Sequence, residues 1–181
     1  MKTLIATLAL AATATAAAAQ QNPTVGGAAM LADRNIVENA VSSPINTTLV
    51  AAVQAAGLAD TLSGEGPFTV FAPTDEAFAR IPADNLTELL APENKAFLQK
   101  ILTCHVVAGD VKSPAIQGMI DDDGGSHVVS TLGGCNLTAT YRGDAITLTD
   151  ENGRTANVVI ANVDQSNGVI HVIDRVLLPR Q

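Results

Sequence analysis

The sequence is poor in aromatic residues, in basic residues and in long apolar segments. It contains no tryptophan, one tyrosine and four phenylalanines, so the flat aromatic platforms that stack on bases or sugars are mostly missing and the core must be aliphatic. Only 10 Lys and Arg residues stand against 18 Asp and Glu residues, which gives a formal net charge of −8. This acidity opposes binding to phosphate backbones and anionic lipid, so nucleic acid is not an expected partner.

The first 19 residues have the pattern of a secretory signal peptide. Lys2 provides a short positive start, an apolar stretch follows it, and Ala17 to Ala19 form a small-residue cleavage site. We therefore expect a secreted or periplasmic bacterial protein. Beyond this leader no apolar run reaches the roughly 18 residues of a membrane-spanning helix, so no membrane span is predicted. The remainder divides into a loose segment over residues 20–35 and one domain over residues 36–179.

Cys104 and Cys135 are the two cysteines of the chain. Export to an oxidising compartment favours a disulfide between them, and two buried free thiols are the alternative. A disulfide that closes a loop of about 31 residues would stabilise the fold by about 3–4 kcal/mol in the chain-entropy description.

Helical patterns fill the first part of the chain and alternating patterns fill the second. Helices are predicted at about 36–41, 47–56, 58–62, 74–81, 86–90 and 92–102. One compact strand, Phe68 to Phe71, interrupts them. Further strands are predicted at about 104–108, 127–132, 136–141, 145–149, 155–163 and 169–177. This order predicts an α+β domain with a helical N-terminal half and a strand-rich C-terminal half.

The segment GVIHVIDRVLLP, residues 168–179, places His171 and Asp174 within an apolar run. Its β-branched residues favour a strand, and the Asn167-Gly168 pair at its start is typical of a turn. Successive side chains of a strand point to opposite faces, so His171 and Asp174 cannot form a catalytic dyad. Because the strand is apolar on both faces, we expect it inside the sheet and not at an edge.

Three segments share their pattern with a known family: FTVFAPTDEAF at 68–78, ILTCHVVAGDV at 101–111 and NGVIHVIDRVLLP at 167–179. The chain resembles a single fasciclin domain of the bacterial secreted type. The resemblance implies a wedge of two β-sheets with helices packed along it, and a role in adhesion or surface interaction rather than catalysis. It also implies that four residues are structural parts of the family motif, namely Thr74, Asp75, His171 and Asp174.

Two stretches are candidates for contact with a partner. Fasciclin domains often carry Tyr-His where this chain has Cys104 and His105, and the resemblance implies that His105 is an interaction residue. A structural histidine held by backbone hydrogen bonds is the alternative. Arg142, Gly143 and Asp144 resemble the integrin-recognition tripeptide and stand at a predicted hairpin connection, where an ordinary turn is the alternative.

No pattern of catalytic or metal-binding residues is complete. Residues 124–128 lack the second glycine of a nucleophile elbow, and His105, His127 and His171 share no ligand spacing. The acidic run 121–123 lacks the alternating oxygen ligands and the distal glutamate of a calcium-binding loop. We therefore predict no catalytic residue, no metal and no cofactor.

Together these observations predict an exported, non-catalytic protein that mediates adhesion to a cell surface or matrix. Its expected partner is a cell-surface or matrix protein or a polysaccharide. Two other functions stay open. One is a periplasmic carrier or sensor of a small ligand, with an apolar pocket lined by residues such as Phe97 and Ile101. The other is an enzyme, such as a hydrolase, that uses His105 or His127.

Overall fold

The structure, a computed structural model, describes residues 22–143 and 145–180. The predicted signal peptide lies outside the described residues. The helices are α1 (Ile36–Ser42), α2 (Thr47–Ala56), α3 (Ala59–Ser63), α4 (Asp75–Ala79), α5 (Ala83–Leu89), the 3-10 helix η1 (Pro92–Asn94), α6 (Lys95–Thr103) and α7 (Ser113–Asp122). The strands are β1 (Phe68–Pro73), β2 (Val106–Ala108), β3 (Ser126–Ser130), β4 (Asn136–Arg142), β5 (Ala145–Thr149), β6 (Thr155–Gln165) and β7 (Gly168–Ile173). The α+β class predicted from the sequence is confirmed.

The seven strands form one hydrogen-bonded sheet in the order β2-β1-β7-β6-β5-β4-β3. β1 and β7 are parallel, and all other neighbours are antiparallel. The strand β6 pairs with β5 near its start and with β7 further along, and register shifts between Val158 and Val163 bend it. Because β6 joins the two halves of the sheet, the hydrogen bonding does not confirm a wedge of two separate sheets.

The last strand, β7, lies between β1 and β6, and all of its residues are buried. The predicted interior position of this strand is confirmed, but the strand ends at Ile173 and not at residue 177. The physical reason is Asp174, whose carboxylate accepts the backbone N–H of Asn157 at 2.7 Å and its side-chain N–H at 2.8 Å. One backbone bond continues the pairing with β6, from the Asp174 N–H to the Asn157 carbonyl at 3.1 Å. The Asp174 side chain takes the Asn157 N–H that a backbone carbonyl would otherwise accept, and the chain leaves the sheet.

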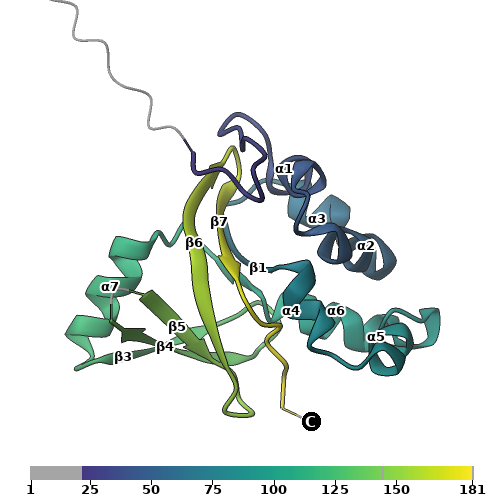
Figure 1. Cartoon of the computed structure of the whole chain (residues 1–181). Coiled ribbons are helices and arrows are strands. Elements are labelled where there is room, and N and C mark those ends of the chain that lie inside the picture. Colours follow the sequence, from purple (N-terminus) through teal and green to yellow (C-terminus); the bar gives the residue numbers. More distant parts are fainter. Residues whose placement is uncertain (1–21, 144, 181) are drawn as a thin grey trace, which may run out of the picture.

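Helices cover the sheet from two sides. Figure 1 shows α1 to α6 on the side of β1 and β7, and α7 on the other side beside β3, β4 and β5. The core is divided accordingly. One cluster under α1 to α6 includes Leu98 and Val172, and a second under α7 includes Ile116, Ile120 and Leu148.

The helix α7 is absent from the sequence prediction, which places only strands after Cys104. Pro114 stands in its first turn, where the missing N–H of proline is tolerated. Ile116 and Ile120, one helical turn apart, are its buried residues. These two apolar residues, with Gly118 between them, give only a weak helical pattern in the sequence. The helix is stabilised mainly by packing against the sheet and less by its local sequence.

The segment before α1 is irregular but packed. Residues 22–35 contain an isolated bridge between Val25 and Ala28, and both Val25 and Met30 are buried. The Asn22 side chain exchanges two hydrogen bonds with the backbone of Asp164 on β6. This segment therefore covers the end of the sheet next to α1.

Candidate functional site

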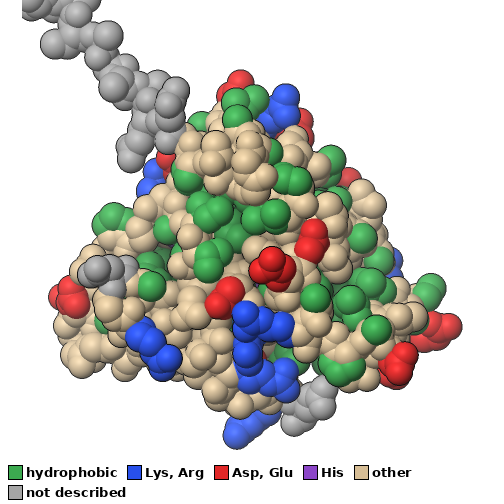
Figure 2. All heavy atoms as spheres, viewed as in Figure 1, with side chains coloured by type: hydrophobic (Ala, Val, Ile, Leu, Met, Phe, Trp, Pro, Cys, Tyr) green, Lys and Arg blue, Asp and Glu red, His purple; other side chains and the backbone are tan. Residues whose placement is uncertain are grey.

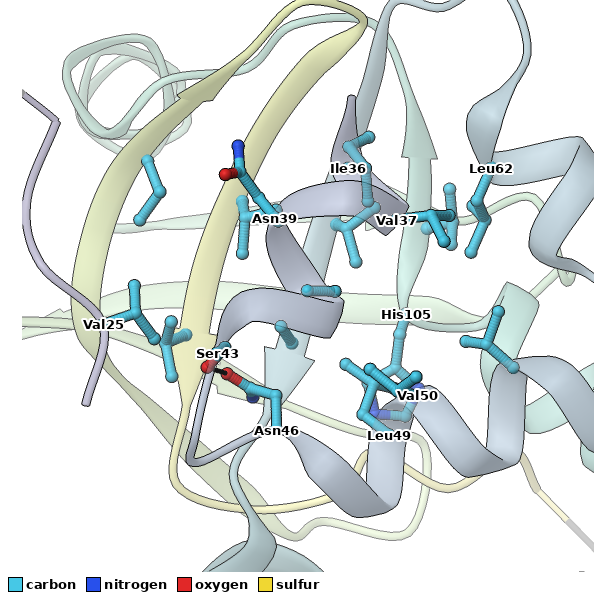
Figure 3. A pocket seen from close by; sticks show the side chains of 18 of the residues that line it. Val25, Ile36, Val37, Asn39, Ser43, Asn46, Leu49, Val50, Leu62 and His105 are labelled. Atoms are coloured by element: carbon cyan, nitrogen blue, oxygen red, sulfur yellow. Dashed lines mark hydrogen bonds between the residues drawn. The ribbon is translucent and has the colours of Figure 1, made fainter. Parts of the chain in front are cut away.

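The helices α1 and α2 cover an apolar cavity on the face of β1 and β7, with a volume of about 50 Å³. Figure 3 shows Ile36 and Val37 from α1 and Leu49 and Val50 from α2 directed toward its interior. Val172 of β7 contributes to the opposite wall. Nearly all of the lining is hydrocarbon, and an apolar cavity of this kind holds no water.

The local sequence explains why two helices meet over this cavity. α1 begins with a capping box, in which Asn35 and Glu38 each bond the other's backbone N–H. α2 ends at Gly57, which has the left-handed φ of 70° that favours glycine. On both helices the apolar residues extend beyond a single helical face. Val37 follows the buried Ile36 on α1, and Val50 follows the buried Leu49 on α2. The widened apolar surfaces of α1 and α2 face each other over the sheet.

Polar side chains at the cavity wall bond to other protein groups. Asn39 donates to the Leu31 carbonyl at 2.7 Å and to the Gln165 side chain, and it accepts the Leu31 N–H at 3.1 Å. The Ser43 hydroxyl donates to Asn46 at 2.7 Å (Figure 3), and Asn46 donates to a backbone carbonyl of β1. The interior of the cavity therefore offers dispersion contacts and almost no hydrogen bonding.

His105 forms part of the cavity wall directly after α6, and 2% of its surface is exposed. Its Nδ1–H donates to the Ile101 carbonyl at 2.8 Å, and its Nε2 accepts the Leu177 N–H at 2.9 Å. Both ring nitrogens are therefore occupied by backbone groups. A partner at the molecular surface does not reach this ring in the folded domain, and the ring has no lone pair left for a metal or a proton transfer.

The electrostatics of His105 agree with this geometry. Burial lowers the pKa of the His105 imidazole to about 4, and the hydrogen bond to Ile101 and the negative charge of Asp150 offset only part of the effect. The histidine is thus neutral at physiological pH, in the one tautomer that suits a carbonyl on Nδ1 and an N–H on Nε2.

A disulfide joins Cys104 to Cys135, with their Cα atoms 5.4 Å apart. It connects the end of α6 to the turn between β3 and β4. The same turn donates the Leu132 N–H to the Val106 carbonyl at 2.8 Å and the Gly133 N–H to the end of α6. The cross-link and these hydrogen bonds hold the far end of the sheet against α6 and β2.

Comparison with known proteins places this arrangement in a family. A fasciclin domain profile matches residues 45–179. The chain belongs to the fasciclin domain family. Protein sll1483 of Synechocystis is 43% identical over 88% of this chain and 82% of its own length. The immunogenic protein MPB70 of Mycobacterium bovis is 35% identical over 77% of this chain and 66% of that protein. The cell surface glycolipoprotein MPB83 of the same species is 34% identical over 89% of this chain and 68% of that protein.

A solved structure has the same fold. It is a FAS1 domain pair from the insect cell adhesion molecule fasciclin I, with a TM-score of 0.71 and 20% sequence identity. The match covers 80% of this chain and 51% of that chain. The resemblance inferred from the three sequence segments is confirmed, and this structural match supports the fold alone.

In this fasciclin domain, Thr74 caps its own helix, α4, and Asp75 connects α4 to α2. The Thr74 hydroxyl accepts the Ala77 N–H at the start of α4. The Asp75 carboxylate accepts the Thr48 N–H at 2.7 Å and the Thr47 hydroxyl at 2.8 Å. Burial raises the pKa of Asp75, but the hydrogen bonds from Thr48 and Thr47 outweigh this effect and leave the pKa below its ordinary value. Asp75 therefore caps α2 from outside that helix.

His171 and Asp174 have separate partners. The His171 Nε2–H donates to the Val111 carbonyl at 2.9 Å, its Nδ1 accepts the Asn162 N–H at 3.3 Å, and its ring stacks on Phe71. Burial lowers the pKa of His171, and the hydrogen bond to Val111 and the charge of Asp110 only partly offset it. Asp174 bonds to Asn157, so these two residues of the family motif connect different pairs of elements.

The fasciclin domain carries Arg142 and Gly143 at the connection between β4 and β5. Arg142 is exposed, and Gly143 has a left-handed φ of 66°, as a tight hairpin turn requires. Asp144, the third residue of the tripeptide, lies outside the described residues. Arg142 and Gly143 therefore belong to an accessible turn and do not line the cavity under α1 and α2.

The cavity is the part of the candidate site that the sequence did not locate. The prediction put Phe97 and Ile101 in a pocket, but neither lines this cavity, and 39% of Phe97 is exposed. Adjacent apolar residues on α1 and α2 were the available signal. Among residues 22–143 and 145–180, no group of three or more His, Cys, Asp or Glu is arranged to hold a metal, and no helix in that part is long and apolar enough to cross a membrane.

Proposed function

We propose that this protein is an exported adhesion module that binds a cell-surface or matrix component by non-covalent contact. The observation that carries the proposal is its membership of the fasciclin family, whose similar members include a mycobacterial cell surface glycolipoprotein. The fold is also that of domains from an insect cell adhesion molecule. Extending a surface role from these proteins to this chain is part of the proposal.

The molecular surface supports a contact function. Apolar side chains with more than half of their surface exposed occur on several elements, including Val41 of α1, Val128 of β3 and Val159 of β6. Figure 2 shows apolar atoms gathered over β6 at the centre of one face, with acidic side chains beside them. Exposed apolar groups rimmed by charge are typical of surfaces that meet other molecules.

Export is the second part of the proposal. The predicted leader over residues 1–19 would send the chain out of the cytoplasm, and the Cys104–Cys135 disulfide suits the oxidising compartment that follows. The protein would then act in the periplasm, at the cell surface or in the medium.

Cell attachment tests the adhesive function directly. We expect a deletion strain to lose retention on its native surface and a strain complemented with the full chain to regain it. The matched control is complementation with a chain that lacks residues 1–19, which we expect to stay inside the cell and restore nothing. Equal retention of all these strains on every relevant surface would contradict the proposal.

A carrier of apolar molecules is the second candidate function, and the cavity under α1 and α2 is the observation that favours it. Its hydrocarbon lining suits a neutral hydrocarbon chain, not a polar metabolite. At about 50 Å³ the cavity would have to widen by separation of α1 from α2, which have few backbone connections to the sheet.

Thermal shift with dodecanol tests the carrier function, because a ligand that binds only the folded state raises the melting temperature. We expect saturable stabilisation of the native protein and its loss in Val50→Phe, which fills the cavity. Val41→Phe is the matched control, since Val41 is 61% exposed on α1 and does not line the cavity. An equal response of both variants would rule out this cavity as the site.

A further inference from the structure

A second hollow lies between α7 and the strands β4, β5 and β6. It is an open groove of about 700 Å³, within the size range of ligand sites in proteins. One wall is polar and comes from α7, with Ser113, Gln117 and Asp121. The floor includes the apolar side chains of Ile146 from β5 and Val158 from β6. The groove is therefore divided into a hydrogen-bonding side and a hydrocarbon side.

The polar wall follows from the helical repeat. Ser113, Gln117 and Asp121 are spaced four residues apart, so they lie along one face of α7 over a length of about 12 Å. Ile116 and Ile120 have the same spacing on the buried side and hold the helix to the sheet. α7 thus keeps a fixed polar stripe turned toward the groove, long enough to contact a short oligomer.

The one tyrosine of the chain lies in this groove. Tyr141, on β4, is half-buried and opposes the C-terminal part of α7. Tyr141 and Asp121 both line the groove, and burial together with the negative charge of Asp121 raises the pKa of Tyr141. The side chain offers a flat apolar ring and a hydroxyl group, in a protein that otherwise has few aromatic surfaces.

We infer that this groove binds a neutral saccharide chain. The apolar C–H face of a sugar ring fits the Tyr141 ring and the apolar floor, while its hydroxyls donate to the Asp121 carboxylate and exchange hydrogen bonds with Gln117. The acidic run 121–123 beside the groove repels uronic and sulfated sugars. The inference rests on the proposed adhesion function, because it names a polysaccharide as the surface component that is bound.

NMR titration of the purified protein tests the site. The probes are maltohexaose, cellohexaose and N-acetylchitohexaose, with oligogalacturonate as the acidic comparison. We expect at least one neutral hexasaccharide to give saturable shifts in the amides of α7 and of β4 to β6. Tyr141→Ala should weaken its affinity by roughly tenfold, and Tyr141→Phe, which keeps the ring, should stay close to the native value.

Two further variants test the same site if Tyr141→Ala folds poorly. Gln117→Ala changes an exposed residue of the groove wall and should weaken binding severalfold. Asp122→Asn changes the neighbour of Asp121, which does not line the groove, and should leave the affinity unchanged. An Asp122→Asn effect equal to that of Gln117→Ala would overturn the inference, because it would place the contact outside the groove.

The remaining outcomes separate this inference from the adhesion proposal. Absence of shifts with all neutral probes at millimolar concentration overturns the saccharide site, as does equal binding of oligogalacturonate. If cells that produce Tyr141→Ala attach like the native strain while the deletion strain does not, adhesion stands and uses another partner, such as a protein. If the hexasaccharide binds but deletion leaves attachment unchanged, the site stands and the adhesive function fails.

Discussion

Each ring nitrogen of His105 has a backbone partner from a different part of the chain. Nδ1 bonds to Ile101 in α6, and Nε2 bonds to Leu177 in the segment that follows β7. Replacing this ring by a methyl group leaves the buried Leu177 N–H without its acceptor, removes one of the two N–H donors to the Ile101 carbonyl, and opens a cavity.

We expect His105→Ala to lower the free energy of unfolding by about 3–4 kcal/mol, measured by urea denaturation. His127→Ala is the matched control. Its side chain is partly exposed and pairs with Asp123 at the surface, so its loss should cost less than about 1 kcal/mol. Similar small effects of both substitutions would show that the hydrogen bonds of His105 contribute little to stability.

The hydrogen bonds that Asp75 accepts from α2 lead to a second prediction about the free energy of unfolding. Asp75→Ala leaves the N–H groups of Thr47 and Thr48 without their acceptor, which should cost about 1–2 kcal/mol. Glu76→Ala is the control in the same first turn of α4, where both acidic residues favour the helix dipole but Glu76 is exposed. Amide hydrogen exchange should be faster in the first turn of α2 in Asp75→Ala alone. Equal exchange in both variants would argue against the cap.

At the scale of elements, Asn162 attaches α7 to the sheet. It lies at the irregular part of β6 with a left-handed φ of 58°. Its side chain accepts the Ser113 N–H and donates to the Ser113 hydroxyl, each at 2.7 Å, while its backbone N–H donates to His171. One residue thus connects β6, β7 and the start of α7.

Two substitutions separate the contributions of Asn162. Asn162→Gly keeps the left-handed backbone without strain but loses the side-chain cap on Ser113 at the start of α7. We expect it to lower the free energy of unfolding by about 1 kcal/mol. Asn162→Ala loses the cap and adds left-handed strain, so it should cost roughly 1 kcal/mol more. Urea denaturation gives both values, and hydrogen exchange should be fastest in α7. If Asn162→Gly costs as much as Asn162→Ala, the strain contributes nothing.

The contrast between β7 and α7 shows what the sequence could predict. Six consecutive buried residues of β7 give a continuous apolar run, and that pattern is typical of a strand with neighbours on both sides. α7 buries only Ile116 and Ile120 and contains Gly118, so its helical period is visible mainly once the sheet beneath it is known. A helix with so weak a local pattern depends on tertiary packing. Because α7 was not predicted, its polar stripe was not predicted either.

The candidate sites were hidden for a related reason. A residue that lines an apolar cavity, such as Val50, looks in the sequence like any core residue, because both kinds occupy the same helical positions. Tyr141 was visible as the one tyrosine, but its opposition to Asp121 needs the placement of α7 against β4. The family was recognisable because its signature residues, such as Thr74 and Asp75, are adjacent in sequence and bond locally or to one neighbouring helix.

At the scale of the whole molecule, two buried histidines connect the helical layer, the sheet and the C-terminal segment. His105 is in contact with α6 and the chain after β7, and His171 is in contact with β6 and the chain before α7. Each uses a ring nitrogen as an acceptor, which a protonated imidazole cannot do. Protonation therefore opposes the folded arrangement at two separated points.

This arrangement predicts that the domain loses stability in moderate acid. Burial lowers the pKa of His105 to about 4 and also lowers the pKa of His171, so below pH 6.5 the unfolded chain binds protons that the folded chain does not. The free energy of unfolding should fall as the pH falls from 6.5 to about 4, with about 3 kcal/mol of the loss due to His105. The pKa of Asp75 lies below its ordinary value because of the hydrogen bonds from Thr48 and Thr47, so this carboxylate contributes only in stronger acid. Urea denaturation should show this loss in His127→Ala and a smaller one in His105→Gln, and an equal loss in both variants would exclude His105 as its source.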